Sequence, residues 1–450
     1  MSTFFIQNFG CRATQADGAA LESALAARGL RPAARHQADF VILNTCTVTA
    51  AADQDVRQAV RRVVRENPLA RILVTGCYAQ RAPEEIAAWP GVAGVVGNTD
   101  KLRLPELVTN GGLLPPEQAR CGTVSAPLVQ VGDIAARQEF VTAVVEDAAG
   151  DRTRPNLKIQ DGCSNRCSFC IIPSVRGRSR SAPADWVVEQ VRGLAARYRE
   201  VVLSGINLGK WGRDLGGGFR LADLVERLLA ETDVERLRLS SVEPMDWSDR
   251  LLGLMAASPR LAPHVHAPLQ TGSDAVLRRM RRPYRARHYE DRIRKARALV
   301  PDAAIGADVM TGFPGETDAE FEENRAFIEA LPFTYLHVFT YSARPGTPAA
   351  SAPGQVPVPV RRERNRVLRE LAAKKNHEFR RSLIGRTLPV VTLQQAGLAL
   401  SGNFVKVQLA RPREPNRLIE VVIGGVTPGG LREQGPAGEP AETPVRAALS

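Results

Sequence analysis

The sequence predicts an α/β protein in three parts: an amino-terminal parallel α/β domain, a partial (β/α)6 barrel and a small carboxyl-terminal β-barrel. Apolar runs alternate with helical patterns through residues 1–350, which is typical of parallel sheets. Several of these runs end in Gly, Cys or polar residues, as the carboxyl edge of such a sheet often does. After residue 386 the helical spacing stops, and short strand patterns separated by Gly and Pro follow.

Length and composition indicate a cytoplasmic globular protein. The 450 residues suffice for about two to four domains, and 44% hydrophobic with 24% charged residues is an ordinary globular balance. No apolar run reaches about 18 residues, and the first residues lack the pattern of a signal peptide, so we expect no membrane span. The seven cysteines are an odd number and mostly lie in metal-like contexts, which indicates a reducing compartment.

The net charge of +12 favours a polyanionic partner such as nucleic acid. The basic residues are nearly all Arg, and Ala is abundant, as a GC-rich coding sequence would also produce. Composition alone therefore leaves RNA binding open.

Residues 1–112 form the predicted amino-terminal domain. Its strands are expected at Phe4–Gly10, Phe40–Thr45 and Arg71–Gly76. Helical apolar spacing covers Asp17–Gly29 and Asp53–Asn67.

Each of these three strands leads to a cysteine: Cys11, Cys46 and Cys77. Because the carboxyl ends of parallel strands lie on one edge, we expect the three thiols to be neighbours. A lone cysteine would most often be an inert buried thiol, but three in the same topological position favour a cluster ligand set. Gly10 and Gly76 would let the backbone approach a metal closely.

Residues 113–148 are predicted to be a linker. Phe140–Val145 could form a strand within it. Cys121 also lies here without a neighbouring Cys or His, so we expect an ordinary thiol.

Residues 149–380 repeat strand then helix about six times, which predicts a partial barrel with its functional groups at the carboxyl ends of the strands. Helices are expected at Ala184–Tyr198, Leu221–Glu231 and Asp318–Ala330. The predicted strands are Leu157–Gln160, Val201–Ser204, Arg236–Ser240, His264–Pro268, Ala304–Met310 and Tyr335–Thr340.

A CxxxCxxC motif, formed by Cys163, Cys167 and Cys170, follows the first of these strands. Three thiolates on one loop can hold three corners of a cubic iron–sulfur cluster and leave the fourth iron open. Zinc is the alternative, but a closed zinc site needs a fourth protein ligand, and the next His after the motif is His264. Phe169 would help to keep water from the metal.

This motif resembles the signature of the radical S-adenosylmethionine (SAM) family. The resemblance implies a 4Fe-4S cluster whose open iron chelates the amino and carboxylate groups of SAM, which is then cleaved to a 5′-deoxyadenosyl radical. It also implies SAM contacts from loops at the strand ends. The candidates are Gly205, Asn207 and Glu243, and Gly312 and Glu316 near the adenine or ribose.

The segment Pro353–Pro359 is predicted to be a linker, and Arg361–Arg386 a helix with ten basic residues against three acidic ones. This helix is either a solvated charged helix or a surface that follows RNA phosphates. A basic cluster at Arg278–Arg287 leaves the same two interpretations open.

Residues 381–450 are predicted to form a small β-barrel of a kind that often binds oligonucleotides, followed by a disordered tail from residue 431. Its strands are expected at Thr387–Thr392, Phe404–Leu409 and Leu418–Ile423. Only Phe404 offers an aromatic face, so we do not expect extensive base stacking.

The domain order and the two cysteine triads resemble the radical SAM methylthiotransferase family, whose terminal barrel is called TRAM. Asn44–Asp53, Ser240–Pro244 and Pro268–Ser273 are most similar to its MtaB type. That type adds a methylthio group to threonylcarbamoyladenosine beside the tRNA anticodon. The resemblance implies two 4Fe-4S clusters, SAM, a tRNA partner and an electron donor such as flavodoxin or ferredoxin, and we expect a monomer.

In this hypothesis the cluster on Cys163, Cys167 and Cys170 generates the radical, and a second cluster on the other triad holds the sulfur to be inserted. Alternatives are methylthiolation of another tRNA adenosine or of a ribosomal-protein aspartate, and a non-catalytic RNA-binding protein with structural zinc. A carbon methylase that used the barrel alone would leave Cys11, Cys46 and Cys77 unexplained.

Overall fold

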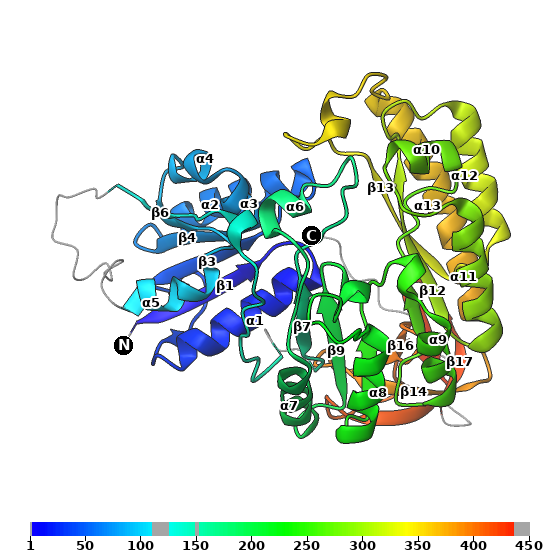
Figure 1. Cartoon of the computed structure of the whole chain (residues 1–450). Coiled ribbons are helices and arrows are strands. Elements are labelled where there is room, and N and C mark those ends of the chain that lie inside the picture. The colour runs from blue at the N-terminus through cyan, green and yellow to red at the C-terminus, as the bar shows by residue number, and fades with distance from the viewer. Residues whose placement is uncertain (1, 110–125, 149–152, 436–450) are drawn as a thin grey trace.

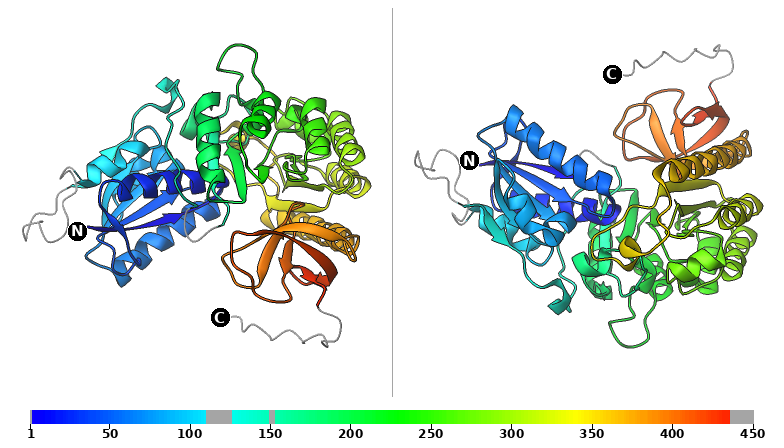
Figure 2. Two further views of the ribbon diagram at one scale, coloured as in Figure 1. Left: turned by 90° about the horizontal axis from the view of Figure 1, so that it is seen from below. Right: turned by 90° about the horizontal axis from the view of Figure 1, so that it is seen from above.

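The computed structural model describes residues 2–109, 126–148 and 153–435. The amino-terminal domain lies against one side of a central barrel (Figure 1). A smaller carboxyl-terminal barrel lies beside the long helix α13, as both views of Figure 2 show. Cys121, most of the predicted tail and part of the predicted linker lie outside the described residues.

The amino-terminal domain is a six-stranded parallel sheet of order β2-β1-β3-β4-β5-β6. The central strand β3 is buried along its whole length, as its apolar run predicts. The strands are β1 (Thr3–Asn8), β2 (Arg31–Pro32), β3 (Phe40–Thr45), β4 (Arg71–Gly76), β5 (Val92–Val96) and β6 (Leu128–Gln130).

The helices of this domain are α1 (Arg12–Ala26), α2 (Ala50–Glu66), α3 (Cys77–Arg81), α4 (Pro83–Ala87) and α5 (Leu104–Thr109). Both long helices begin before the predicted Asp17 and Asp53. In α2 the Thr49 hydroxyl accepts a hydrogen bond from the Ala52 amide, 3.2 Å, so a cap fixes the start upstream of the apolar spacing.

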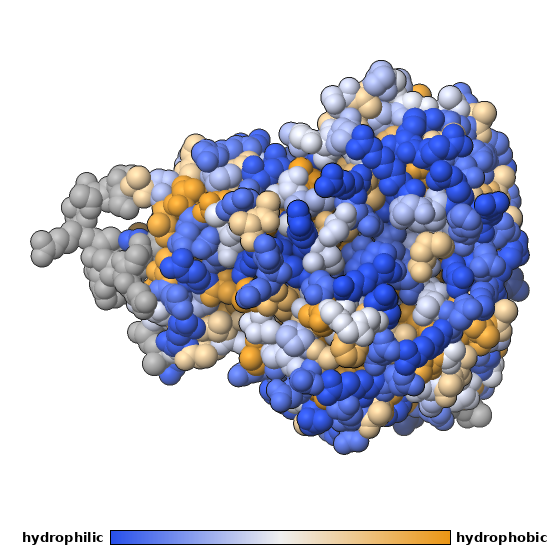
Figure 3. Space-filling model, in the orientation of Figure 1, coloured by the Kyte–Doolittle hydropathy of each residue, from blue (hydrophilic) through white to orange (hydrophobic). Residues whose placement is uncertain are grey.

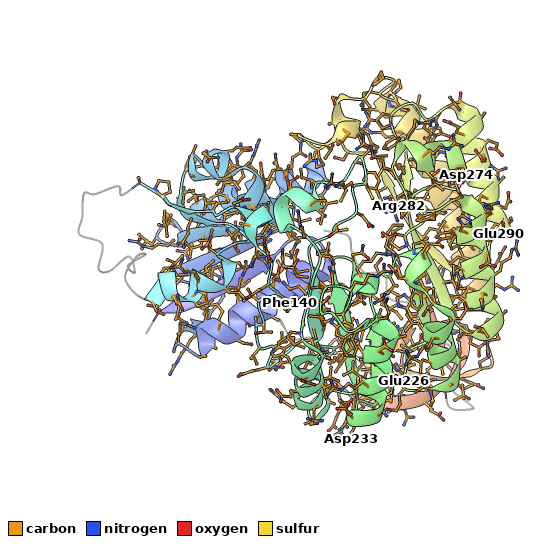
Figure 4. The ribbon with its side chains drawn as sticks, in the orientation of Figure 1. Phe140, Glu226, Asp233, Asp274, Arg282 and Glu290 are labelled. Carbon is orange, nitrogen blue, oxygen red and sulfur yellow. The ribbon has the colours of Figure 1, made fainter. Side chains whose placement is uncertain are left out.

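The predicted strand at Phe140–Val145 is wrong. This segment is not a strand, because the antiparallel β8 (Arg180–Ser181) pairs with the free edge of β7 (Asn156–Asp161) instead. Phe140 packs against Trp186, with ring centroids 6.2 Å apart, and lies between α1 and β7 in Figure 4. The segment is therefore a packed connection between the two domains.

The central domain confirms the six predicted parallel strands. They form two sheets, β10-β9-β7-β8 and β11-β12-β13, joined by a bridge between Leu237 and Leu261. No described strand joins β13 back to β7 or β8, so the barrel is partial. The remaining strands are β9 (Glu200–Gly205), β10 (Arg236–Leu239), β11 (His264–His266), β12 (Ala304–Thr311) and β13 (Tyr335–Thr340).

Helices cover the outside of the barrel, and hydrophilic residues dominate that face in Figure 3. The predicted bounds of α8 and α12 are confirmed, and α12 begins with a capping box of Thr317 and Glu320. The helices are α6 (Ile172–Arg176), α7 (Ala184–Ala195), α8 (Leu221–Glu231), α9 (Asp249–Ala257), α10 (Asp274–Arg279), α11 (Ala286–Leu299), α12 (Asp318–Ala330) and α13 (Val358–Arg381).

Helix α13 starts inside the predicted linker, because Pro359 is compatible with a first helical turn. It packs along β13, and several of its cations bond to the barrel. Arg364 pairs with Glu316 at 2.6 Å, and Lys375 donates to the backbone carbonyl of Leu331 at 2.8 Å. Several positive charges on this helix therefore contact the barrel, which favours a role in packing over a surface that follows RNA phosphates.

The carboxyl-terminal domain is a closed barrel of order β14-β15-β16-β18-β17. The sequence analysis missed β15 and β18, which are only four residues long. The strands are β14 (Thr387–Thr392), β15 (Leu398–Ser401), β16 (Lys406–Gln408), β17 (Leu418–Thr427) and β18 (Gly430–Glu433).

A buried ion network joins the amino-terminal domain to the central barrel. Asp17 of α1 accepts from Lys101 at 2.8 Å and from Arg176 at 3.0 Å, and it also pairs with Lys158 of β7. Burial opposes ionisation of Asp17, but these three cations hold its pKa well below the ordinary value. Asp17 is therefore a carboxylate, and it fixes α1 against the barrel wall.

A second buried carboxylate joins the central barrel to the carboxyl-terminal barrel. Glu200 accepts from Arg238 at 2.7 Å and also pairs with Arg236 and Arg154. Burial opposes ionisation, but these arginines, Arg238 first, lower the pKa of Glu200 to about 2. Arg238 also donates to the backbone carbonyl of Gly402, 2.8 Å, so one charge cluster holds both domains.

None of the described helices is both long enough and apolar enough to cross a membrane.

We expect Asp17→Asn to destabilise the protein by about 3 kcal/mol or more, because it leaves buried cations without a counter-charge. Asp55→Asn, at an exposed position of α2, is the matched control and should change stability by less than about 0.5 kcal/mol. Because the pKa of Asp17 is depressed, its contribution is present above the unfolded pKa, about 4, and is lost as pH falls further. Urea unfolding at pH 7 and pH 3 measures both effects; equal loss in the two variants would contradict this role.

Candidate metal centres and central chamber

The first cysteine triad lies at the carboxyl edge of the amino-terminal sheet, where the strand ends predict it. Cys46 follows β3, Cys77 opens α3 and Cys11 caps α1. A Cβ atom on Gly10 would lie 2.8 Å from the Cys46 sulfur. Burial, followed by the nearby Cys77 and Cys11, raises the pKa of Cys46 to about 12. The three thiols are thus neighbours; Cys46 and Cys77 are buried, and Cys11 is exposed.

Two glycines allow the backbone segments at this edge of the sheet to lie close to one another. Gly10 and Gly76 have φ angles of 97° and 101°, a region that favours glycine. A Cβ atom on Gly76 would lie 2.4 Å from the carbonyl oxygen of Thr45. Any side chain there would push the Cys46 and Cys77 loops apart.

The second triad occupies the loop between β7 and α6. Its cysteines receive hydrogen bonds from two distant elements: Asn207 donates to the Cys163 sulfur at 3.5 Å, and Arg282 to the Cys167 sulfur at 3.3 Å. Burial, followed by the neighbouring Cys167 and Cys163, raises the pKa of Cys170 to about 12.

The two triads are close because α6, directly after the CxxxCxxC loop, packs on Cys77. Ile171 and Val175 form a buried cluster with Cys77. Arg176 donates to the Cys77 sulfur at 3.2 Å while its other nitrogens bond to Asp17 and Asp161. One arginine thus connects the first triad, the ion network and the loop of the second triad.

The sulfur spacing fits iron–sulfur clusters better than zinc. Among the described residues, the one group of three or more His, Cys, Asp or Glu ligands with all ligand atoms within 4.8 Å contains no cysteine. Four-coordinate zinc would bring its sulfur ligands to about 3.8 Å from one another, given zinc–sulfur bonds of about 2.3 Å. Each triad is therefore too open for a single zinc ion and offers the three-thiolate donor set of a larger cluster.

A chamber of about 670 Å³ fills the interior of the partial barrel. Cys11 and all three cysteines of the second triad line it, whereas Cys46 and Cys77 are buried outside its lining. Three of the predicted SAM contacts, Gly205, Asn207 and Glu243, also line it. Further lining side chains that matter here are Arg12, Phe169, His264, His266, Arg282, Asp308, Tyr335, His337 and Phe404.

The other two predicted SAM contacts, Gly312 and Glu316, are not in this lining. Glu316 accepts from the Gly312 amide at 2.7 Å and pairs with Arg364 of α13. A Cβ atom on Gly312 would lie 2.0 Å from the Arg361 side chain. The structure thus places this loop in the packing of α13 against β12.

Arg282 is a chamber residue that the sequence analysis did not single out. It lies inside the predicted basic cluster, yet its side chain is only 3% exposed and points into the barrel near Cys167 (Figure 4). It pairs with Glu243 and lies over the ring of Tyr284, 5.0 Å from the centroid. No sequence signal separates it from the exposed Arg281; only burial does.

The inner wall opposite the cysteines carries polar side chains from β11, β12 and β13. The Tyr335 hydroxyl lies 2.7 Å from His264 Nε2 and 2.8 Å from His266 Nδ1. Asp308 lies 3.2 Å from both His266 and His337, and the ligand atoms of these three could hold a cation. Alternate positions on a strand face the same side, which is the signal that could have identified them.

Two side chains of this wall, His264 and Asp308, have shifted pKa values. Burial, followed by the nearby Arg238, holds the pKa of His264 well below its ordinary value, so its imidazole is neutral. Burial opposes ionisation of Asp308, but its bonds to His266 and His337 lower its pKa. The wall therefore offers a carboxylate, a phenol and imidazoles to a polar ligand.

Comparison with known proteins places the two cysteine triads in two matched regions. Residues 3–97 match the uncharacterized protein family UPF0004, and residues 157–328 match the radical SAM superfamily. The chain is 34% identical to the threonylcarbamoyladenosine tRNA methylthiotransferase MtaB of Aquifex aeolicus, over 93% of this chain and 99% of the relative.

The name of a second relative indicates a different substrate. The chain is 35% identical to a tRNA-2-methylthio-N(6)-dimethylallyladenosine synthase of Novosphingobium aromaticivorans, over 86% of each chain. Among solved structures, the radical S-adenosylmethionine methyltransferase TsrM from Kitasatospora setae, with cobalamin and a [4Fe-4S] cluster bound, matches with a TM-score of 0.53. It covers 78% of this chain and 77% of its own, at 17% identity, so this likeness concerns the fold.

We expect Arg282→Met to destabilise the protein by about 3 kcal/mol, because it leaves the Glu243 carboxylate without its partner inside the chamber. Arg281→Met removes the same side chain one residue earlier, at an exposed position, and is the matched control. Thermal unfolding of both variants measures the difference. Adding Glu243→Gln to Arg282→Met should recover part of the loss, and strict additivity of the two changes would argue against the pairing.

Proposed function

The chain belongs to the radical SAM tRNA methylthiotransferases, and we propose that it adds a methylthio group to the adenine of threonylcarbamoyladenosine beside the tRNA anticodon. Similarity to a relative of that activity over nearly the whole of both chains supports this substrate. The observation that carries the proposal is the shared chamber: Cys11 of one triad and Cys163, Cys167 and Cys170 of the other line the same cavity.

The family uses SAM and 4Fe-4S clusters, and the two triads are the proposed ligand sets. Cys163, Cys167 and Cys170 would hold the cluster that binds SAM, and Cys11, Cys46 and Cys77 the second. When bound, these groups supply a carbon-centred radical and a sulfur source, which acid–base side chains cannot provide at a ring carbon that bears only hydrogen.

The residues around the second triad orient its ligands and limit water. Asn207 and Arg282 donate to two of the sulfurs, and these hydrogen bonds fix the positions of both side chains. Arg282 also holds the Glu243 carboxylate at the chamber wall, where it can accept from an amino group of SAM. Phe169 packs edge-on against Phe313, centroids 6.4 Å apart, and covers the loop with apolar surface.

Gly205 leaves room in the chamber at the end of β9. A Cβ atom there would lie 2.9 Å from the Gln160 side chain, whose oxygen accepts from the Asn207 amide at 2.7 Å. A larger residue at 205 would displace Gln160 and, with it, the Asn207 side chain that bonds to Cys163. Gly205 thus acts as a positioning residue for that ligand.

Each domain has a role in this proposal. Residues 1–112 hold the sulfur-donor centre, residues 113–148 link it to the radical core at 149–380, and residues 381–450 contain the TRAM-like barrel. The target adenosine enters between the first domain and the barrel. The net charge of +12 suits both tRNA and an acidic electron carrier such as flavodoxin or ferredoxin, and the protein acts as a cytoplasmic monomer.

Other functions have less support. The sulfur spacing disfavours the non-catalytic protein with structural zinc. Both compared relatives act on tRNA according to their names, which disfavours a ribosomal-protein aspartate as the target.

Mass spectrometry of tRNA nucleosides from a deletion strain tests the substrate. We expect the methylthio form of threonylcarbamoyladenosine to disappear and the unmethylthiolated form to accumulate. The wild-type gene should restore the modification, and a Cys167→Ala gene should not. Loss of a different methylthio nucleoside, with this one unchanged, would assign the enzyme to another substrate.

The two triads should be separable by mutation. Anaerobic protein should contain about eight iron atoms, and Cys46→Ala and Cys167→Ala should each lose about four, if each triad holds one cubane cluster. Cys167→Ala should abolish SAM cleavage, whereas Cys46→Ala should retain cleavage but stop sulfur transfer. Iron and sulfide assays with product analysis measure this; methylthiolated RNA from the Cys46 variant would refute the assignment.

A further inference from the structure

We propose that Arg12 and the inner wall of the chamber form a subsite for the anionic threonylcarbamoyl substituent of the target adenosine, with Arg12 pairing with its carboxylate. The subsite consists of Arg12, His266, Asp308, Tyr335 and His337, all of which line the chamber. It deepens the proposed function and rests on it, because the substrate named there carries this substituent.

Arg12 is a cation for which residues 2–109, 126–148 and 153–435 provide no ion-pair partner. It opens α1, beside Cys11, and its guanidinium lies 5.6 Å from the centre of the Phe404 ring. Within the described part of the chain, its guanidinium makes no ion pair or hydrogen bond with another side chain. An arginine guanidinium carries a positive charge at neutral pH.

The charges behind Arg12 do not neutralise it. Arg154, Arg236 and Arg238 all pair with the single carboxylate of Glu200. Arg236 and Arg238 alone already outnumber this one carboxylate before Arg12 is added. A largely buried guanidinium in such a field is costly without a counter-ion, so an anionic group entering the chamber would be bound there.

The inner wall supplies the remaining contacts. A threonylcarbamoyl group carries a carboxylate, a hydroxyl and two N–H donors. Asp308 accepts from N–H and hydroxyl groups, and Tyr335 and the imidazoles of His266 and His337 can donate or accept. Cys11, Cys163, Cys167 and Cys170 line the same chamber, so an adenine held near them can extend this substituent toward Arg12 and the side chains of β11, β12 and β13.

This subsite would discriminate between the substrates of the two compared relatives. A dimethylallyl group has no polar atom, so it would leave the Arg12 guanidinium desolvated and without a counter-ion. Sites built to hydrogen-bond a polar group reject an apolar analogue strongly for that reason. The arrangement therefore favours the threonylcarbamoyl substrate by its chemistry, independently of sequence identity.

Binding of anticodon stem-loop RNA to the full-length, cluster-loaded protein tests the subsite without relying on turnover. Fluorescence anisotropy would compare RNA that carries threonylcarbamoyladenosine with the same RNA carrying adenosine. We expect wild-type protein to prefer the modified RNA by about tenfold or more, as for a charge-assisted hydrogen bond. Arg12→Met should lose this preference while binding unmodified RNA as before, and Arg12→Lys should retain part of it.

The controls separate charge recognition from damage to the fold. Arg31→Met removes an exposed arginine from β2, at the opposite end of the sheet from the cysteines, and should keep the full preference. The iron content of Arg12→Met should equal that of wild type, and its melting temperature should be no lower, because the variant loses a guanidinium that has no counter-ion. RNA whose threonyl carboxylate is a methyl ester should bind wild type as weakly as the free acid binds Arg12→Met.

Two outcomes would overturn the subsite. If Arg12→Met keeps the wild-type preference, or if the ester binds wild type as well as the acid does, Arg12 does not bind the carboxylate. Neither result affects the proposed activity, which the nucleosides of the deletion strain test separately.

Discussion

The relative position of the two cysteine triads depends on one buried carboxylate, Asp17. It draws Lys101 from its own domain and Lys158 and Arg176 from the barrel into a single network. With Asp161, which pairs with Lys158, Arg176 and Arg180, the network contains four cations against two anions. Arg176 of this network also donates a hydrogen bond to the Cys77 sulfur. The same residue thus joins the domains and contacts a proposed metal ligand.

The incomplete barrel explains why the amino-terminal domain must be held against it by this ion network. Six strands leave one side open, and a radical formed in an open cleft would react with water or with the protein. Helix α1 packs along β7 and places Cys11 and Arg12 in the lining of the chamber. The domain that would supply the sulfur therefore also forms part of the chamber wall.

Sequence reasoning was most successful where local pattern and topology decide the outcome. Apolar runs predicted the six barrel strands and the bounds of α8 and α12, and the rule for strand ends brought Cys11, Cys46 and Cys77 together. It was weakest for charged residues, because their role depends on what tertiary packing buries. Neighbouring Arg281 and Arg282 look alike in sequence, yet one is exposed and the other bonds to a cysteine ligand.

Sequence reasoning also failed for short strands and irregular segments. The four-residue strands β15 and β18 carry too few residues for a period to be recognised, and Phe140–Val145 has strand-forming residues but no free edge to pair with. The resemblance implies that the loop from Gly312 to Glu316 lies near the adenine or ribose of SAM, and this stays a prediction. In the structure its Glu316 carboxylate pairs with Arg364 of a helix far along the chain.

Phe404 links the carboxyl-terminal barrel to the reaction chamber. It adopts a left-handed φ of 62°, unusual for a bulky residue, and its ring stacks on His264 with centroids 4.5 Å apart. The carboxyl-terminal barrel, which looks like a separate domain in the sequence, thus contributes a residue to the lining of the chamber. This contact constrains the evolution of the carboxyl-terminal barrel. Exchanging the barrel between homologues would alter the shape of the chamber as well as the binding of nucleic acid.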